Sequence, residues 1–317
     1  MKILITGSMG FISRNLIEKK LINDEKIIKI YGIDHIDSQI KSNKYHHLKF
    51  DLTENTLNNL PNEIFDVDII IHTAGIPSPK FYKIEPFKTI FLNYDLTKFL
   101  LEKMNENTSF IYFSSSEIYG NPDISNIPTN ENYYGYVSSI GDRSCYDESK
   151  RLGETICYLF KNYLNRKIKI IRPFNFYGDY MKEEDNRIIP KFVSQAMSNQ
   201  DITIFKNGDQ TRTYCNIDDA IDMIKNICLE GKSFVYNVGK TEEEISAKEL
   251  ATKILFTIPE SKSKLIFIEY PDDYPSDEPI RRCPDISKYV KEFNQKPSIS
   301  IDSGLKNFYK YAKENWT

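Results

Sequence analysis

Tyr146 and Lys150 are two residues whose types and spacing suit proton transfer at a hydroxyl group. On a helix, side chains four residues apart project from the same face, so these two would lie close together. The phenol of tyrosine has a reference pKa of about 10 and is a poor base near neutral pH. A lysine ammonium beside it stabilises the phenolate and lowers that pKa, which makes the phenol a usable base. Because this spacing is common on helices, its meaning depends on the elements that surround it.

The elements of the first half alternate between short apolar strands and helical patterns. This alternation predicts a doubly wound parallel sheet of the Rossmann kind, an α/β fold. Ligands of such sheets bind beyond the carboxyl ends of the strands, where this sequence carries polar and small residues. The expected strands are 2–5, 27–33, 67–71, 109–113 and 167–171, and the main expected helices are 88–104 and 145–164.

The regular alternation of strands and helices ends at about residue 175, after which prolines separate short elements. We therefore expect residues 1–175 to form a Rossmann domain, with a further strand near 234–238 that returns to its sheet. Residues 176–317 are expected to form mainly a smaller, irregular C-terminal region that closes over the cleft and binds the substrate.

A glycine-rich turn, Gly7-x-x-Gly10, follows the first strand and opens a helical pattern. Glycine lets the backbone turn tightly and approach a pyrophosphate, which then rests at the helix N-terminus. Asp34 ends the second strand, where a carboxylate binds ribose hydroxyls and repels a 2′-phosphate. These residues predict an NAD-binding domain and give the tyrosine–lysine pair a hydride acceptor. Ser13 stands where a third glycine usually allows close packing of helix and strand, and we expect the serine to fit.

Composition limits the class of function. The 317 residues carry 42 Lys and Arg against 45 Asp and Glu, a net charge of −3, which argues against a dedicated nucleic-acid binder. No apolar run approaches the roughly 18 residues of a membrane helix, and the N-terminal apolar stretch is too short for a signal peptide. The five cysteines form no CxxC pair and the four histidines lack metal-ligand spacing, so no metal site is predicted. We expect a cytoplasmic protein without nucleic-acid or membrane partners.

Further motifs extend the pattern along the chain. They are Thr6-Gly7-x-x-Gly10-Phe11-Ile12, Ser-Ser-Ser-Glu-x-Tyr-Gly at 114–120, Arg-Pro-Phe-Asn-Phe-Tyr-Gly at 172–178 and Gly-Asp-Gln-Thr-Arg at 208–212. With them the chain resembles the extended short-chain dehydrogenases/reductases of the NAD-dependent epimerase/dehydratase family, which act on nucleotide sugars. The branch it resembles most is that of the UDP-glucuronate decarboxylases (UDP-xylose synthases), through Ser78-Pro79 with Tyr82 and Pro86, the run 141–151 and the run 277–286.

The resemblance implies which residues would bind NAD. The pyrophosphate would lie on Gly7, Gly10, Phe11 and Ile12, the adenosine ribose on Asp34, and the adenine beside Asp51 and Leu52. The rest of the dinucleotide path would be lined by Ala74, Asn93 and Phe174, with Tyr146 as the base and Lys150 on the nicotinamide ribose.

The resemblance also implies which residues would bind and convert a nucleotide sugar. Ser115 would hydrogen-bond the sugar 4-hydroxyl, and Glu117 with Ser116 would act at C5. The other substrate-binding residues would be Ser78, with Asn175 and Arg212 on the nucleotide diphosphate and Arg282 near the sugar, its carboxylate or the diphosphate. In this family the tyrosine helix and the helix expected at 88–104 often form a four-helix bundle between two subunits, which implies a homodimer.

By this resemblance, the expected reaction is decarboxylation of UDP-glucuronate to UDP-xylose through oxidation at C4. The alternatives are a 4-epimerase, a 4-dehydrogenase or a 4,6-dehydratase acting on another UDP-, GDP- or dTDP-sugar, and a non-catalytic NAD-binding regulator. Dehydratases of the family typically carry an aspartate where this chain has Ser116, and a serine hydroxyl is too weak an acid for that role. Epimerases typically lack the glutamate that this chain has at position 117, which counts mildly against them.

Overall fold

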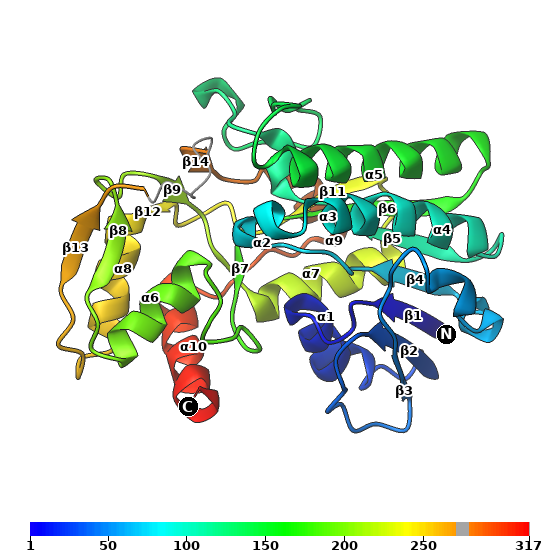
Figure 1. Ribbon diagram of the computed structural model, residues 1–317, viewed down its shortest axis with the longest axis horizontal. Coiled ribbons are helices and arrows are strands. Elements are labelled where there is room, and N and C mark those ends of the chain that lie inside the picture. Colours follow the sequence, from blue (N-terminus) through cyan, green and yellow to red (C-terminus); the bar gives the residue numbers. More distant parts are fainter. Residues whose placement is uncertain (271–278, 317) are drawn as a thin grey trace. The chain divides into compact units, whose positions relative to one another are not determined.

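The computed structural model describes residues 1–270 and 279–316, and the chain divides into two compact units (Figure 1). Unit 1 comprises Met1–Ile118, Tyr136–Pro173 and Ile221–Tyr236. Unit 2 comprises Tyr119–Gly135, Phe174–Ala220 and Asn237–Thr317. Each unit is therefore assembled from segments that are distant in the sequence.

A seven-stranded sheet with strand order β3-β2-β1-β4-β5-β6-β11 forms the centre of unit 1. The neighbouring pairs from β3 to β6 are all parallel, which confirms the doubly wound α/β prediction. The strand order reverses between β1 and β4, the position at which such sheets bind their ligands. The strands are β1 (Lys2–Thr6), β2 (Lys29–Asp34), β3 (Tyr45–Lys49), β4 (Ile69–His72), β5 (Ser109–Phe113), β6 (Lys167–Pro173) and β11 (Val235–Val238).

Helices cover both faces of this sheet (Figure 1). Their apolar sides pack on the strands around a core that includes Leu4, Ile70, Leu96, Phe110 and Cys157. Removing this apolar surface from water is the main force that holds helices and sheet together. One face carries α3 (Pro86–Asn93), α4 (Asp95–Lys103) and α5 (Ser144–Tyr163), and the other carries α1 (Phe11–Leu16), the π-helical segment η1 (Ile17–Leu21) and most of α7 (Ile217–Glu230).

Two local predictions need correction. The helix expected at 88–104 is interrupted at Tyr94, which separates α3 from α4. The apolar spacing continues across the break because both helices pack on the same sheet, so periodicity alone did not mark it. Strand β3 was not expected, because its sequence Tyr-His-His-Leu-Lys carries little apolar character.

Unit 2 is built from short strands and from α6 (Ile188–Met197), α8 (Ala247–Thr257), α9 (Ser287–Phe293) and α10 (Ile301–Asn315). Its described residues form small sheets with orders β10-β7, β12-β9-β14 and β13-β8, in keeping with the irregular C-terminal region that was expected. The strands are β7 (Phe176–Tyr177), β8 (Ile202–Phe205), β9 (Thr211–Arg212), β10 (Cys215–Asn216), β12 (Ile245–Ser246), β13 (Leu265–Ile268) and β14 (Arg281–Arg282).

Across residues 1–270 and 279–316, no helix combines the length and the apolar character needed to cross a membrane. The same residues contain no group of His, Cys, Asp and Glu side chains that could hold a metal ion.

Candidate active site

The tyrosine–lysine pair lies in the first half of α5, where both side chains are buried. Nζ of Lys150 is 5.8 Å from the centre of the Tyr146 ring. The same ammonium donates a 2.7 Å hydrogen bond to the carbonyl of Phe113, the last residue of β5. The helix thus holds the pair against the carboxyl end of a central strand, which is the edge where ligands bind in this fold.

Burial sets the proton affinity of both groups. It raises the pKa of Tyr146 to about 12, against a hydrogen bond from Ser115 that lowers it. It also lowers the pKa of Lys150 to about 7. The expected lowering of the tyrosine pKa is therefore wrong, because loss of solvation outweighs the lowering effects of Ser115 and of the Arg143 charge.

Three predicted residues follow β5 directly, in the turn η4 (Ser116–Tyr119) and just before it. Ser115 and Ser116 are buried. The main-chain N–H of Glu117 donates to Oγ of Ser115 at 3.1 Å. Because Ser115 also hydrogen-bonds the phenol of Tyr146, the structure brings together Ser115, Tyr146, Lys150 and the turn that carries Glu117.

Arg143 was not assigned a role from the sequence, yet it lies at the centre of this group of residues. Its guanidinium donates to Glu117 and lies near Asp147, and it is almost completely buried. A basic residue three positions before the tyrosine on the same helix face is the signal that could have pointed to it.

The glycine turn forms a close-packed cradle between β1 and α1. Gly7 has a φ of +69°, and a Cβ there would lie 2.8 Å from Cα of Ala74. Ser13 fits between helix and strand, as expected, with its hydroxyl 2.5 Å from that of Thr73. Asp34 is buried and accepts a 2.9 Å hydrogen bond from the N–H of Met9, within the glycine turn. This arrangement lets the turn pass close to the backbone of Ala74 and places the carboxylate of Asp34 beside the turn.

The remaining predicted cofactor residues lie in different surroundings. Nδ2 of Asn93 donates to Oγ of Ser149 on α5 at 2.9 Å, so Asn93 is tied to the tyrosine helix. Leu52 is part of the core of unit 1, whereas Asp51 is exposed. Phe174 belongs to unit 2, where it is buried with its ring 5.9 Å from that of Tyr119.

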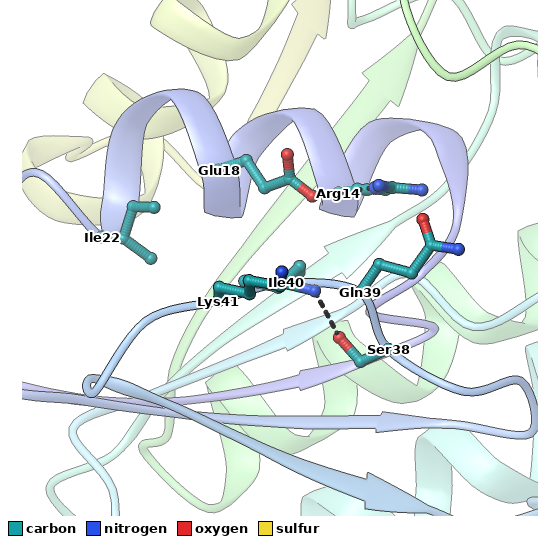
Figure 2. A pocket seen from close by; sticks show the side chains of 7 residues that line it. All are labelled: Arg14, Glu18, Ile22, Ser38, Gln39, Ile40 and Lys41. Atoms are coloured by element: carbon teal, nitrogen blue, oxygen red, sulfur yellow. Dashed lines mark hydrogen bonds and ion pairs between the residues drawn. The ribbon is translucent and has the colours of Figure 1, made fainter. Parts of the chain in front are cut away.

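A polar hollow of about 680 Å³ lies between the helical segment after the glycine turn and the loop after β2 (Figure 2). None of the residues that line it was predicted from the sequence as a site residue. The loop that forms one wall leaves Asp34 directly, and Nε of Arg14 donates to Glu18 on the other wall. The lining residues are Arg14, Glu18, Ile22, Ser38, Gln39, Ile40 and Lys41.

Two predicted arginines lie side by side in unit 2. Arg212 on β9 and Arg282 on β14 are directly opposite each other in a parallel pair, so both side chains point to the same face. Both are buried. Arg212 donates to the carbonyls of Thr211 and Ile280 at 2.9 and 3.0 Å. Two buried cations at neighbouring positions suit the binding of an anion such as a diphosphate.

The other predicted substrate residues are placed as follows. Asn175 belongs to unit 2 and has a φ of +42°, and its Nδ2 donates to the carbonyl of Thr213 at 3.1 Å. Ser78 precedes α2 (Pro79–Ile84) in unit 1 and is half-buried. Of the run 277–286 that contributed to the family resemblance, Asp277 and Glu278 lie outside the described residues.

The chain is similar to a known protein family over most of its length. The model of the "NAD dependent epimerase/dehydratase family" matches residues 3–239. The chain is 32% identical over 312 residues to UDP-glucuronic acid decarboxylase 5 of Arabidopsis thaliana, a match that covers 96% of this chain and 87% of that protein.

Solved structures share the fold over the whole chain. UDP-glucuronic acid 4-epimerase from Bacillus cereus, solved with UDP-glucuronic acid and NAD, superimposes with a TM-score of 0.82 at 25% identity and covers 100% of both chains. The dTDP-glucose 4,6-dehydratase from Bacillus anthracis, solved with NAD, gives a TM-score of 0.83 at 20% identity over 100% of this chain and 97% of that one. The second likeness is one of fold alone.

Proposed function

This chain belongs to the NAD dependent epimerase/dehydratase family, and we propose that it oxidises C4 of a nucleotide sugar and acts as a UDP-glucuronate decarboxylase that makes UDP-xylose. The observation that carries the proposal is the convergence of Ser115, Tyr146 and Lys150 at the carboxyl end of β5, with Glu117 in the same turn. Similarity to a UDP-glucuronic acid decarboxylase over nearly the whole chain supports the choice of substrate.

The glycine turn fits NAD, the cofactor of the family. Gly7 gives the turn its left-handed backbone next to Ala74, and Asp34, at the end of β2, stands where it can bind ribose hydroxyls. When bound, NAD supplies the acceptor for the hydride that leaves C4.

Oxidation at C4 requires a base for the 4-hydroxyl proton. Tyr146, in its phenolate form, takes that proton while the C4–H electron pair leaves with the hydride. Ser115, hydrogen-bonded to the phenol, also holds the 4-oxygen. Lys150, whose pKa is about 7, gains or loses its charge near neutrality and in its charged form offsets the negative charge on the phenolate.

Decarboxylation follows from the position of the new ketone. The C4 carbonyl is β to the C6 carboxylate, so the C5–C6 bond breaks, CO₂ leaves and its bonding electrons enter an enolate. The hydroxyls of Tyr146 and Ser115 donate to the enolate oxygen. A proton from solvent, delivered through a water that Glu117 orients, then forms the C5–H bond. Return of the hydride to C4, together with transfer of the Tyr146 proton back to the 4-oxygen, would complete UDP-xylose.

We assign the diphosphate to Arg212 and Asn175, and the sugar carboxylate or diphosphate to Arg282. The pairing of these two buried arginines at opposite positions of β9 and β14 supports an anionic ligand at this position.

The first test is incubation of the NAD-loaded protein with UDP-glucuronate, followed by mass spectrometry. We expect release of CO₂ and formation of UDP-xylose. The second candidate is a 4-epimerase acting on the same substrate, which the likeness to the Bacillus cereus enzyme favours. Formation of UDP-galacturonate without CO₂ would select that candidate and reject the decarboxylase.

We also propose that the protein is a homodimer assembled through α3 and α5. These helices are in contact with each other in unit 1 and expose large apolar side chains, of which Phe87 is 84% and Tyr163 77% exposed. On α5, Leu159 is also exposed, whereas Ile156 and Phe160 pack partly against the core. A four-helix bundle would cover the exposed residues.

All five cysteines are free thiols, which fits the expected cytoplasmic location.

A further inference from the structure

A buried cation links two carboxylates beside the candidate catalytic residues. The side chain of Arg143 is only 4% exposed, and its Nη2 donates to Oε2 of Glu117. Its Nε lies 3.6 Å from Oδ2 of Asp147, whose side chain is 10% exposed. Burying any one of these three charges alone would cost free energy, so the guanidinium and the two carboxylates stabilise one another in this position.

The two carboxylates belong to different elements. Arg143 is the N-cap residue of α5, and Asp147, four residues later in the first turn, fixes the guanidinium to this helix. Glu117 lies in the turn η4, after β5. The guanidinium presents one nitrogen to each partner, so it ties the turn that follows the central strand to the helix that carries the tyrosine.

Glu117 is the partner that the proposed reaction uses. Its side chain is 23% exposed, so its carboxylate can face a ligand or a water while Oε2 is held by Arg143. Its main-chain N–H donates to Oγ of Ser115, which in turn hydrogen-bonds Tyr146. A side chain that fixes Glu117 therefore acts on the group responsible for C5 and not only on the stability of the fold.

We propose that Arg143 is a positioning residue for the step at C5. Through a bridge anchored on Asp147, it holds the carboxylate of Glu117 where that group orients the water that delivers a solvent proton to C5. The inference rests on the proposed function and assigns Arg143 no contact with the substrate. Lysine would keep the positive charge but offers a single nitrogen, so it cannot reproduce the bridge.

The test compares Arg143→Gln, Arg143→Lys, Glu117→Gln and the Arg143→Gln/Glu117→Gln double variant in the NAD-loaded protein with UDP-glucuronate. Reduction of bound NAD in the first turnover should fall far less than UDP-xylose formation, because the bridge acts on C4 oxidation only through the effect of its charges on the pKa of Tyr146. UDP-xylose formation should fall about 10²-fold in either glutamine variant, a typical loss for a proton-transfer group. The double variant should be no slower than the slower single one. Arg143→Lys should recover only part of the loss.

Arg151→Gln is the matched control. Arg151 lies on the same helix, and its Nη1 donates to the carbonyl of Ile118 in the same turn at 3.1 Å. Arg151→Gln therefore removes a guanidinium that contacts η4 and leaves the bond between Arg143 and Glu117 in place. Rates of this variant should stay within about threefold of wild type in both steps.

Two results would overturn the inference. A raised KM with unchanged kcat in Arg143→Gln would make Arg143 a substrate ligand, and losses that multiply in the double variant would make the two residues independent. If wild type releases no CO₂ from UDP-glucuronate, the proposed function itself fails. Thermal unfolding then tests separately whether Arg143 and Glu117 are coupled. Non-additive Tm shifts in the same variants would support the bridge, and additive shifts would refute it.

Discussion

The ring of Tyr82 lies flat against the ring of Tyr146, with centroids 4.6 Å apart and planes inclined by 14°. Tyr82 is buried and comes from α2, a short helix that follows β4 in the sequence. The candidate base is thus covered on one face by the stacked ring, while the ammonium of Lys150, anchored on the carbonyl of Phe113, lies 5.8 Å from the centre of its ring. Such packing restricts the phenol to one orientation, which is what proton transfer at a fixed hydroxyl requires.

Removing the stacked ring should therefore impair both stability and turnover. Tyr82→Leu should cost at least the 0.5–1.5 kcal/mol that aromatic pairs typically contribute, and it should lower kcat about tenfold by releasing the Tyr146 ring. Tyr82→Phe keeps the ring and should retain most of the activity. Denaturant unfolding and steady-state assays measure the two effects. Equal losses in both variants would show that the hydroxyl, and not the stack, is what matters.

The low pKa of Lys150 predicts how the stability of the NAD-free protein depends on pH. Burial lowers this pKa from 10.5 to about 7, so between these values the unfolded chain binds more protons than the folded one. Stability should then rise with pH from about 7 to about 10.5, by at most about 1.4 kcal/mol per pH unit. Lys150→Met should lack this contribution. Urea titrations of both proteins at several pH values provide the comparison, and parallel curves would contradict the assignment.

His72 predicts a second pH effect, on the acid side. Its ring is buried at the end of β4, next to the hydroxyl of Thr6 and the carbonyl of Leu92. Burial, with the charge of Lys150, lowers the pKa from 6.5 to about 3. The folded protein should lose stability as the pH falls from about 6.5 toward 3, because unfolding lets the imidazole take up a proton. In His72→Asn this part of the loss of stability at low pH should be absent. Urea titrations between pH 6.5 and 3 that show the same loss in His72→Asn and in wild type would rule out a contribution from His72.

The glycine turn can be tested through Gly7. An alanine Cβ would stand 2.8 Å from Cα of Ala74, at a φ of +69° that L-residues rarely adopt. Gly7→Ala should lose about 1–3 kcal/mol of stability and retain less NAD through purification. Thermal unfolding and the cofactor content of the purified protein check this. A variant that keeps a full complement of NAD would show that this turn does not hold the dinucleotide.

The central sheet could be predicted because most of its strands are buried on both faces and therefore read as continuous apolar runs, such as Ile3–Ile5 and Ile69–Ile71. Strand β3 could not, because it lies at the edge of the sheet and alternates with polar residues. The two-residue strands β9 and β14 carry almost no local signal, and their pairing joins segments about seventy residues apart.

The candidate site likewise contains residues whose proximity follows from local sequence spacing and residues whose contacts depend on the packing of distant segments. Tyr146 and Lys150 meet because helical geometry alone brings them together, so their proximity could be read from spacing. The bond between Arg143 and Glu117 depends on how the turn after β5 packs against α5, which no local pattern encodes. The direction of the Tyr146 pKa was wrong for the same reason, since burial is a property of the packed site.

Replacement of Tyr146 by phenylalanine tests the account most directly. The NAD-loaded Tyr146→Phe variant is mixed with UDP-glucuronate, and NAD reduction and UDP-xylose formation are followed beside wild type and Tyr158→Phe, an exposed tyrosine on the same helix. We predict that Tyr146→Phe loses both reactions by at least about 10²-fold and that Tyr158→Phe keeps them. Conversion of UDP-glucuronate by Tyr146→Phe at the wild-type rate would contradict the assignment of the base and, with it, oxidation at C4.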